Sequence, residues 1–235
     1  MIHRPAAVTR YGVVLAAVLA TLVPPAWSLA VAQATGVHPI SGRRFAEVMD
    51  ASGAAWLDRR ERDVEEAPDD AIDIIGVKKG WAVADIGAGS GYMTVKLSKK
   101  VGPAGVVYAS DIQPTMIALL EKRMTSAKIT NVRSILGAAD DPKLPAGALD
   151  MALMVDVYHE LSQPQAMLRH IHEALKPAGR LILLEYRKED PSIPIRPEHK
   201  MSVAEARLEL EAEGFKLARV DDGLPRQHVL IFTKK

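Results

Sequence analysis

Three glycines at alternate positions are the part of this sequence most suited to binding a ligand. Gly87, Gly89 and Gly91 follow a short apolar stretch, 82–86, and precede a helix-compatible stretch, 92–100. Because glycine has no Cβ, it permits a sharp turn and a close approach of the backbone to a ligand. A turn from strand to helix also directs free N–H groups at the start of the helix towards that ligand. The spacing therefore predicts a cofactor-binding turn.

Two acids support this interpretation. Asp85 lies two residues before the first glycine, and a second apolar stretch, 106–110, ends at Asp111. An acid about twenty residues after such a turn accepts hydrogen bonds from ribose hydroxyls in nucleoside cofactors. An ordinary tight turn would not need both acids, so we expect a cofactor that contains a nucleoside.

The glycine spacing distinguishes between cofactors. Dinucleotide-binding folds use Gly-x-Gly-x-x-Gly, and Tyr92 stands here where the last of those glycines would be. The pattern Asp85-x-Gly87-x-Gly89-x-Gly91 resembles motif I of class I S-adenosylmethionine (SAM) methyltransferases. The resemblance implies SAM as the cofactor, and an NAD-dependent oxidoreductase is the disfavoured alternative.

The order of elements predicts the fold that positions this turn. Apolar strands and amphipathic helices alternate, which predicts a mostly parallel sheet with helices on both faces. The predicted strands are 82–86, 106–110, 132–136, 151–155 and 181–185, and the predicted helices lie near 93–100, 114–125 and 163–175.

The C-terminal part completes the predicted sheet. Ser202 and Glu205 form a capping box for a helix that ends at Gly214. The strands 215–220 and 229–233 are joined by a turn too short for a crossover helix, so they should be antiparallel. The predicted fold is Rossmann-like, with a mostly parallel seven-stranded sheet, a C-terminal antiparallel hairpin and helices on both faces. This ending is typical of class I methyltransferases.

The family resemblance covers about residues 43–235. Residues 166–181 resemble the segment before the fifth strand in the methyltransferase type 11 and ubiquinone/menaquinone-biosynthesis-like group. Residues 185–202 and 224–228 resemble an exported bacterial subgroup of these enzymes. The resemblance implies the fold and the cofactor and leaves the acceptor open.

The resemblance also implies roles for individual residues of the cofactor site. It places the amino-acid part of SAM over the glycine turn, with Asp85 near the α-amino group. Asp111 would accept the ribose hydroxyls, and Ile112 would flank the adenine. Asp140, or its neighbour Asp141, would lie near the adenine amino group. The predicted set is Asp85, Gly87, Ala88, Gly89, Gly91, Asp111, Ile112, Asp140 and Val155.

The segment Tyr158-His159-Glu160 matches the place where the family contacts the methyl group and the acceptor. Methyl transfer requires alignment and, for an oxygen or nitrogen acceptor, removal of a proton. His159 is the candidate base, oriented by Glu160 or Asp156; the alternative is a structural histidine that caps the loop. Tyr158 either lines the methyl pocket or packs in the core.

A second polar set flanks a proline-rich loop of the kind that shapes pockets. Glu185, Tyr186 and His199 are the predicted substrate-binding residues, and surface ion pairing is the alternative. Asp156, Glu160 and Glu185 could hold Mg²⁺ in principle. The Asp–Asn pair that catechol-type methyltransferases use after the fifth strand is absent, so no metal is predicted.

Charge and composition bear on the partners. The formal net charge is +1, there is no cysteine and no basic run, and an Asn/Asp-Pro-Pro-Tyr motif is absent. These features favour a small organic acceptor, methylated on oxygen or nitrogen, over nucleic acid. The competing hypothesis is a module that binds SAM or S-adenosylhomocysteine without transfer. The oligomeric state is left open.

The N-terminus has the pattern of a secretory signal peptide. Arg4 and Arg10 precede the apolar run 12–23, and Ala30-Val31-Ala32 offers a small-x-small cleavage site. The run is shorter than the ~20 residues that span a bilayer. We expect a signal peptide over residues 1–32, a periplasmic or secreted chain, and no stable membrane insertion after cleavage. An uncleaved membrane anchor is the alternative.

The mature chain is expected to have two parts. Residues 33–67 form an N-terminal helical extension, and residues 68–235 form the methyltransferase domain. The mixed-charge run 58–66 in the extension is either a solvated helix face or a lid over the cofactor.

Overall fold

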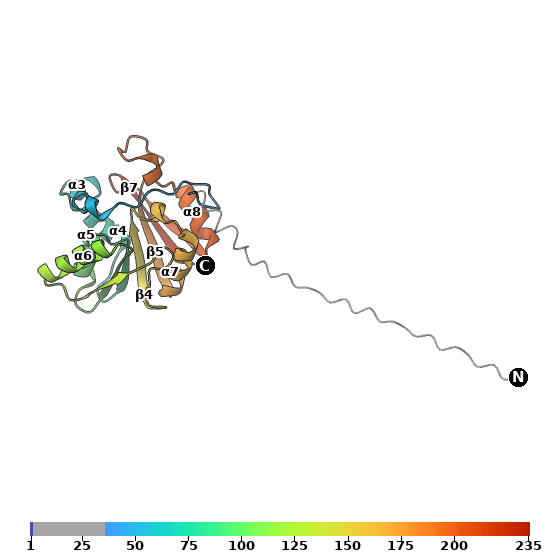
Figure 1. The fold of residues 1–235 in the computed structure, drawn as a ribbon, viewed down its shortest axis with the longest axis horizontal. Helices are drawn as coiled ribbons and strands as arrows, with labels where there is room; N and C mark the ends of the chain where they lie inside the picture. The colour runs from blue at the N-terminus through green and yellow to red at the C-terminus, as the bar shows by residue number, and fades with distance from the viewer. Residues whose placement is uncertain (2–35) are drawn as a thin grey trace.

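A computed structural model describes Met1 and residues 36–235, so the predicted signal peptide lies outside the described residues. The described chain forms one seven-stranded sheet in the order β3-β2-β1-β4-β5-β7-β6 (Figure 1). The strands are β1 (Ala82–Ile86), β2 (Val106–Asp111), β3 (Val132–Leu136), β4 (Leu149–Val155), β5 (Leu175–Tyr186), β6 (Phe215–Asp221) and β7 (Gln227–Lys234).

Helices cover both faces of the sheet. Helices α4 (Pro68–Ile75), α5 (Tyr92–Val101) and α6 (Pro114–Ser126) lie on one side, and α7 (Pro164–Ala174) and α8 (Val203–Ala212) lie on the other (Figure 1). Strands buried on both faces are continuously apolar. In β5, alternate residues therefore enter different cores.

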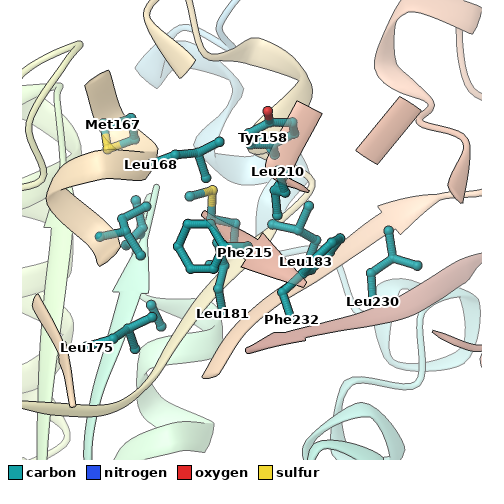
Figure 2. Packing of buried hydrophobic residues seen from close by; sticks show 14 of the residues in the cluster. Tyr158, Met167, Leu168, Leu175, Leu181, Leu183, Leu210, Phe215, Leu230 and Phe232 are labelled. Carbon is teal, nitrogen blue, oxygen red and sulfur yellow. The ribbon is translucent and has the colours of Figure 1, made fainter. Parts of the chain in front are cut away.

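The core beneath α7 and α8 is built from large apolar side chains. Leu181 and Leu183 of β5 pack there beside Phe215 and Phe232 (Figure 2). Their neighbours in β5 point to the opposite face, where they meet α4 and α5. Burial of apolar surface thus stabilises the packing of helices on both faces of the sheet. Polar side chains lie at the ends of the strands.

The pairing of the last strands confirms the predicted hairpin. Strand β7 is antiparallel to both β5 and β6, whereas β1 to β5 pair in parallel. The largest difference from a predicted strand boundary is in β5, which begins at Leu175 instead of Leu181. Leu175 pairs with Leu149, and the next pair is Arg180 with Met151. The pairing of β5 with β4 thus begins at Leu175, before a register shift, and becomes regular from Arg180 onwards.

The strand order reverses direction between β1 and β4. Starting from β1, the chain adds β2 and β3 on one side and β4 and β5 on the other. Open α/β sheets bind ligands at the carboxyl ends of the strands beside such a reversal. The glycine turn follows β1 directly, so it lies at this position.

The N-terminal extension consists of short elements, η1 (Ala51–Gly53), α2 (Ala54–Leu57) and α3 (Arg62–Glu65). It is attached to the far end of the chain by a buried pair: Arg43 donates to both carboxylate oxygens of Glu209 in α8, at 3.1 and 3.0 Å. Within the described residues, no helix is long and apolar enough to cross a bilayer.

Candidate active site

A cavity of about 570 Å³ opens at the carboxyl ends of β1, β2 and β4. Its walls include the glycine turn, the residues that follow β4, and part of the N-terminal extension. Pockets of a few hundred cubic ångströms enclose most of a cofactor-sized ligand. The cavity therefore has the position and the size that the glycine turn predicts.

The glycine turn depends on glycine for its backbone and for its packing. Gly87, Gly89 and Gly91 have φ values of 71°, 53° and 89°, in the left-handed region that favours glycine. A Cβ at Gly87 would lie 2.5 Å from a methyl carbon of Val157. A Cβ at Gly89 would lie 3.3 Å from Leu57 of α2. The turn is thus enclosed by the loop after β4 and by the extension.

Both predicted acids lie at the ends of their strands and line the cavity. Asp85 is buried and accepts a hydrogen bond of 2.6 Å from the Thr94 hydroxyl. Its burial raises the pKa from 3.8 to about 6, and the nearby Asp111 contributes to the increase. Asp111 accepts from the Gly89 and Gln113 N–H groups, both at 2.9 Å, and burial raises its pKa. Asp111 therefore holds the glycine turn as well as facing the ligand space.

Of the other predicted cofactor residues, all but one line the cavity. Ile112 and Val155 line the cavity, as does Ala88 in the turn. After β3 the wall is formed by Ala138 and Ala139, and Asp140 lies beyond it. The role of Asp140 near an adenine stays a prediction.

A partly buried cluster of histidines and carboxylates forms another part of the cavity wall. His159, on the short helix η2 (Tyr158–Glu160), lies 2.5 Å through Nδ1 from Oε2 of Glu185. Its Nε2 lies 3.2 Å from Nδ1 of His199, on η3 (Pro197–His199), and 4.0 Å from Oε1 of Glu160. His159, Glu160 and His199 all line the cavity. The cluster and the glycine turn thus line the same cavity.

Burial and mutual charge shift the pKa values in this cluster. For His159, burial favours the neutral ring, but the Glu185 carboxylate outweighs it and the pKa is raised. Burial raises the pKa of Glu160 to about 7. The pKa of His199 is lowered by burial and by the neighbouring His159. Such shifts, in a cleft, mark groups suited to proton transfer or to ligation.

The orienting partner of His159 differs from the prediction. We expected Glu160 or Asp156, whereas Glu185 contacts Nδ1 and also accepts from the Tyr158 N–H at 2.9 Å. The reason is the register of two parallel strands, because Val155 in β4 pairs with Leu184 in β5. The residues after that pair meet at the same edge. Glu185 is fully buried and contacts Nδ1 of His159, so it orients that ring instead of binding an acceptor as predicted.

Two further predicted residues have different surroundings. Tyr158 is fully buried among apolar side chains under α7 and α8, in keeping with the packing alternative (Figure 2). Tyr186 lines the cavity, and its hydroxyl donates to Glu66 at 2.9 Å. Arg62 donates to the same carboxylate at 2.6 Å. Tyr186 thus contacts both the cavity and the extension.

The extension provides part of the cavity wall, in keeping with the lid alternative for the mixed-charge run. Met49, Leu57 and Arg62 line the cavity, and the Met49 carbonyl accepts from the Gln113 side chain at 2.9 Å. Arg62 belongs to the mixed-charge run, but it is buried. Its four-residue spacing to Glu66 gave an ambiguous signal, since such pairs are common on solvated helices.

Comparisons with known proteins agree with this geometry. Residues 83–179 match the family model described as a methyltransferase domain. The chain is 33% identical over 118 residues to the ubiquinone/menaquinone biosynthesis C-methyltransferase UbiE of Pasteurella multocida, and 32% identical to that of Citrobacter koseri. These matches cover 50% of this chain and 44% and 47% of the relatives, so the chain spans about half the length of the curated relatives it matches.

Solved structures extend the comparison to most of the fold. A SAM-dependent methyltransferase from Aquifex aeolicus superimposes with a TM-score of 0.74 at 29% identity, over 79% of this chain and 98% of that one. A TehB-like SAM-dependent methyltransferase from Corynebacterium glutamicum shares the fold, with a TM-score of 0.58 at 18% identity, over 79% of this chain and 100% of that one.

Sheet order, glycine turn and paired acids together define a class I SAM-dependent methyltransferase, a class whose cofactor is SAM. Within this class the chain carries a methyltransferase domain over residues 83–179 and has UbiE C-methyltransferases among its relatives. The resemblance of the sequence motifs is thereby confirmed.

Proposed function

We propose that the protein transfers the methyl group of SAM to a small organic acceptor, through an oxygen or nitrogen atom of that acceptor. One observation carries the proposal: a single cavity is lined in one part by the glycine turn and its acids and in another part by the His159 cluster. A module that only binds SAM or S-adenosylhomocysteine would not need the second wall. The transferase is therefore favoured over that alternative.

The geometry supports a simple mechanism. The glycine turn and Asp85 would hold the amino-acid part of SAM and Asp111 its ribose, and the bound cofactor would supply the methyl group for transfer. Holding acceptor and methyl in line can supply several kcal/mol, up to ~7–11 in favourable systems. The acceptor loses its proton at the cluster, where Glu185 orients His159. Removal of a proton by a positioned group contributes a further factor of about 10²–10⁴.

The cavity walls favour an acceptor of limited size. Pro194 and Ile195 lie beside His199, and Met49 and Trp56 contribute further apolar surface from the extension. Such walls suit a compact, partly apolar molecule and not a nucleic acid strand. The UbiE relatives are named C-methyltransferases, and a hydroxyl that loses its proton at the cluster would also activate an adjacent ring carbon. Carbon acceptors therefore belong in a substrate screen.

Calorimetric titration tests the cofactor first. We expect SAM and S-adenosylhomocysteine to bind with one-to-one stoichiometry and NAD not to bind. A screen for release of S-adenosylhomocysteine, over phenols, amines and enolisable ring compounds, then tests transfer. Tight binding of SAM with no turnover over all three acceptor classes would favour the binding module instead.

We also propose that residues 1–32 are a cleaved signal peptide and that the chain is periplasmic or secreted. Arg4, Arg10, the apolar run and the small-x-small site support this proposal. Expression in a Gram-negative host should yield a mature N-terminus at Gln33 or Thr35 by mass spectrometry. An intact chain in the membrane fraction would indicate an anchor, and an intact cytoplasmic chain would contradict both.

A further inference from the structure

We propose that His159, Glu160 and His199 together bind a divalent transition-metal ion in the cavity that the glycine turn also lines. The ion itself would be a new feature of the site, and its catalytic role rests on the proposed function. The proposal departs from the sequence expectation of no metal. That expectation considered only acids near the ends of β4 and β5, whereas this trio includes a residue beyond the proline-rich loop.

The distances between the three ligand atoms carry the proposal. His159 Nε2 lies 3.2 Å from His199 Nδ1 and 4.0 Å from Glu160 Oε1, and those last two atoms are 3.9 Å apart. A circle through three points with these separations has a radius of about 2.2 Å, close to the ~2.0–2.2 Å of zinc–nitrogen and zinc–oxygen bonds. An ion can therefore contact all three atoms with little movement of the side chains.

The support behind His159 is a second, independent observation. Glu185 is buried and accepts a hydrogen bond from the Tyr158 N–H. Its Oε2 lies 2.5 Å from Nδ1 of His159. A proton on Nδ1 leaves the lone pair of Nε2 directed into the cluster. Histidines that bind metals almost always make such a bond to a carboxylate through their other nitrogen, which fixes the ring and its tautomer.

The donor set indicates the class of metal. Two imidazoles and one carboxylate suit Zn²⁺ and related first-row ions, whereas Mg²⁺ and Ca²⁺ prefer sites made of oxygen. The side chains of His159, Glu160 and His199 are 2%, 15% and 24% exposed, so the site is shielded but reachable from the cavity. Three protein ligands leave a position open, which is the pattern of catalytic zinc sites.

An open position next to the methyl group defines an acceptor class. We infer an acceptor that coordinates the ion through a hydroxyl of a phenol or enol. Coordination lowers the pKa of the hydroxyl, and with Nε2 of His159 bound to the ion the proton leaves to solvent instead of to that histidine. The oxygen then attacks the methyl carbon of SAM: the O–CH₃ bond forms as the S–CH₃ bond breaks. The sulfonium becomes the neutral thioether of S-adenosylhomocysteine.

Metal titration of the tag-free full chain tests the site directly. After dialysis against a chelator, Zn²⁺ and Co²⁺ are titrated by calorimetry, and Co²⁺ also by its visible absorption. We expect one equivalent to bind, with His199→Ala and Glu160→Gln each weakening binding at least a hundredfold. Glu185→Gln should weaken it 10–100-fold, as loss of a supporting carboxylate does in other sites. His170→Ala, on the exposed face of α7, is the matched control and should bind as wild type.

The outcomes separate this inference from the proposed function. SAM affinity, measured on each variant, reports whether the fold is intact. Absence of stoichiometric binding by the wild type, or equal binding by a folded His199→Ala variant, overturns the metal site. Full turnover after chelation overturns its catalytic role while the methyltransferase stands. Metal binding in a protein that binds no SAM overturns the proposed function and leaves the metal site standing.

Discussion

The two walls of the cavity are built in different ways. The cofactor wall is made of backbone turns and strand ends from adjoining stretches of chain: Asp111 contacts Gly89 across 22 positions. The acceptor wall is made of side chains from separate elements: His159 contacts Glu185 across 26 positions and His199 across 40. A wall made of backbone depends on which residues can adopt its turn, whereas a wall made of side chains depends on how the strands align.

This difference predicts two kinds of failure. Substitutions in the glycine turn should weaken cofactor binding through shape, and substitutions in the acceptor wall should lower the rate while cofactor binding persists.

The largest effect is expected at His159. His159→Ala removes the group that Glu185 holds towards the acceptor, so turnover should fall by ~10²–10⁴ while SAM affinity is nearly unchanged. Steady-state kinetics with an acceptor from the screen, together with SAM calorimetry, measure the two quantities. The exposed His170→Ala variant should retain both. A parallel loss of SAM affinity in His159→Ala would show that the walls are not separable.

A smaller effect, confined to binding, is expected at the glycine turn. Gly89→Val forces a branched residue into a backbone with φ 53° and crowds Leu57, so SAM affinity should fall more than tenfold, over ~1.4 kcal/mol. Gly80→Val is the matched control, because Gly80 has φ 81° but has open space around its Cβ position, away from the cavity. Both variants should lose stability, as thermal unfolding reports, and only Gly89→Val should lose SAM. Unchanged affinity in a folded Gly89→Val variant would refute the cofactor assignment.

Asp111 tests the ribose contact. Asp111→Ala removes an acceptor that the two cofactor forms share, so SAM and S-adenosylhomocysteine should both bind about tenfold more weakly. Parallel calorimetric titrations check this, with Asp69→Ala on the exposed surface of α4 as the control. If only SAM weakened, Asp111 would instead sense the sulfonium charge or the methyl group.

The smallest effect is a dependence of SAM binding on pH. Because the pKa of Asp85 is raised to about 6, half of the free protein carries a neutral Asp85 at that pH. The α-amino group of SAM favours the ionised form, so affinity should fall about twofold from pH 7 to pH 6. Calorimetry at both values checks this, and an Asp85→Asn variant that keeps the same pH step would exclude Asp85 as its source.

Stability should change in the opposite direction. The folded-state pKa of Asp85 lies above its ordinary 3.8, so the protonated group stabilises the fold below about pH 4. That contribution is lost as the pH rises through about 6. The Asp85 contribution to the free energy of unfolding should therefore decrease over the range in which SAM affinity increases. Comparing wild type with Asp85→Asn by chemical denaturation isolates it.

The same contrast explains what could be predicted from the sequence. The glycine turn and its acids form a motif of local spacing, and the strands beside them are continuous apolar runs, so the fold and a nucleoside cofactor followed from the residues, and SAM from the family resemblance. The terminal hairpin followed from a connection too short for a helix. Each of these features depends on neighbours in the chain.

The acceptor wall could be predicted only in part. His159 and His199 were identified as candidates, but the role of Glu185 depends on the pairing of Val155 with Leu184, which no local pattern encodes. The position of Arg62 was ambiguous for a related reason. Its charge suggests a solvent-exposed side chain, whereas the packing of the extension buries it. The sequence identifies these residues as candidates, whereas the strand register and the packing of the elements determine which of them are in contact.

The attachment of Arg43 has a consequence for the order of assembly. Arg43 donates to Glu209, 166 positions later, and to the carbonyl of His159 at 3.0 Å. Contacts between distant parts of a chain form late, because the long intervening loop must close first. The glycine turn can take shape once β1 and β2 have paired, whereas Arg43 can bridge Glu209 and the His159 carbonyl only after α8 has been synthesised. We therefore expect this link between α8 and the acceptor wall to form later than the cofactor wall.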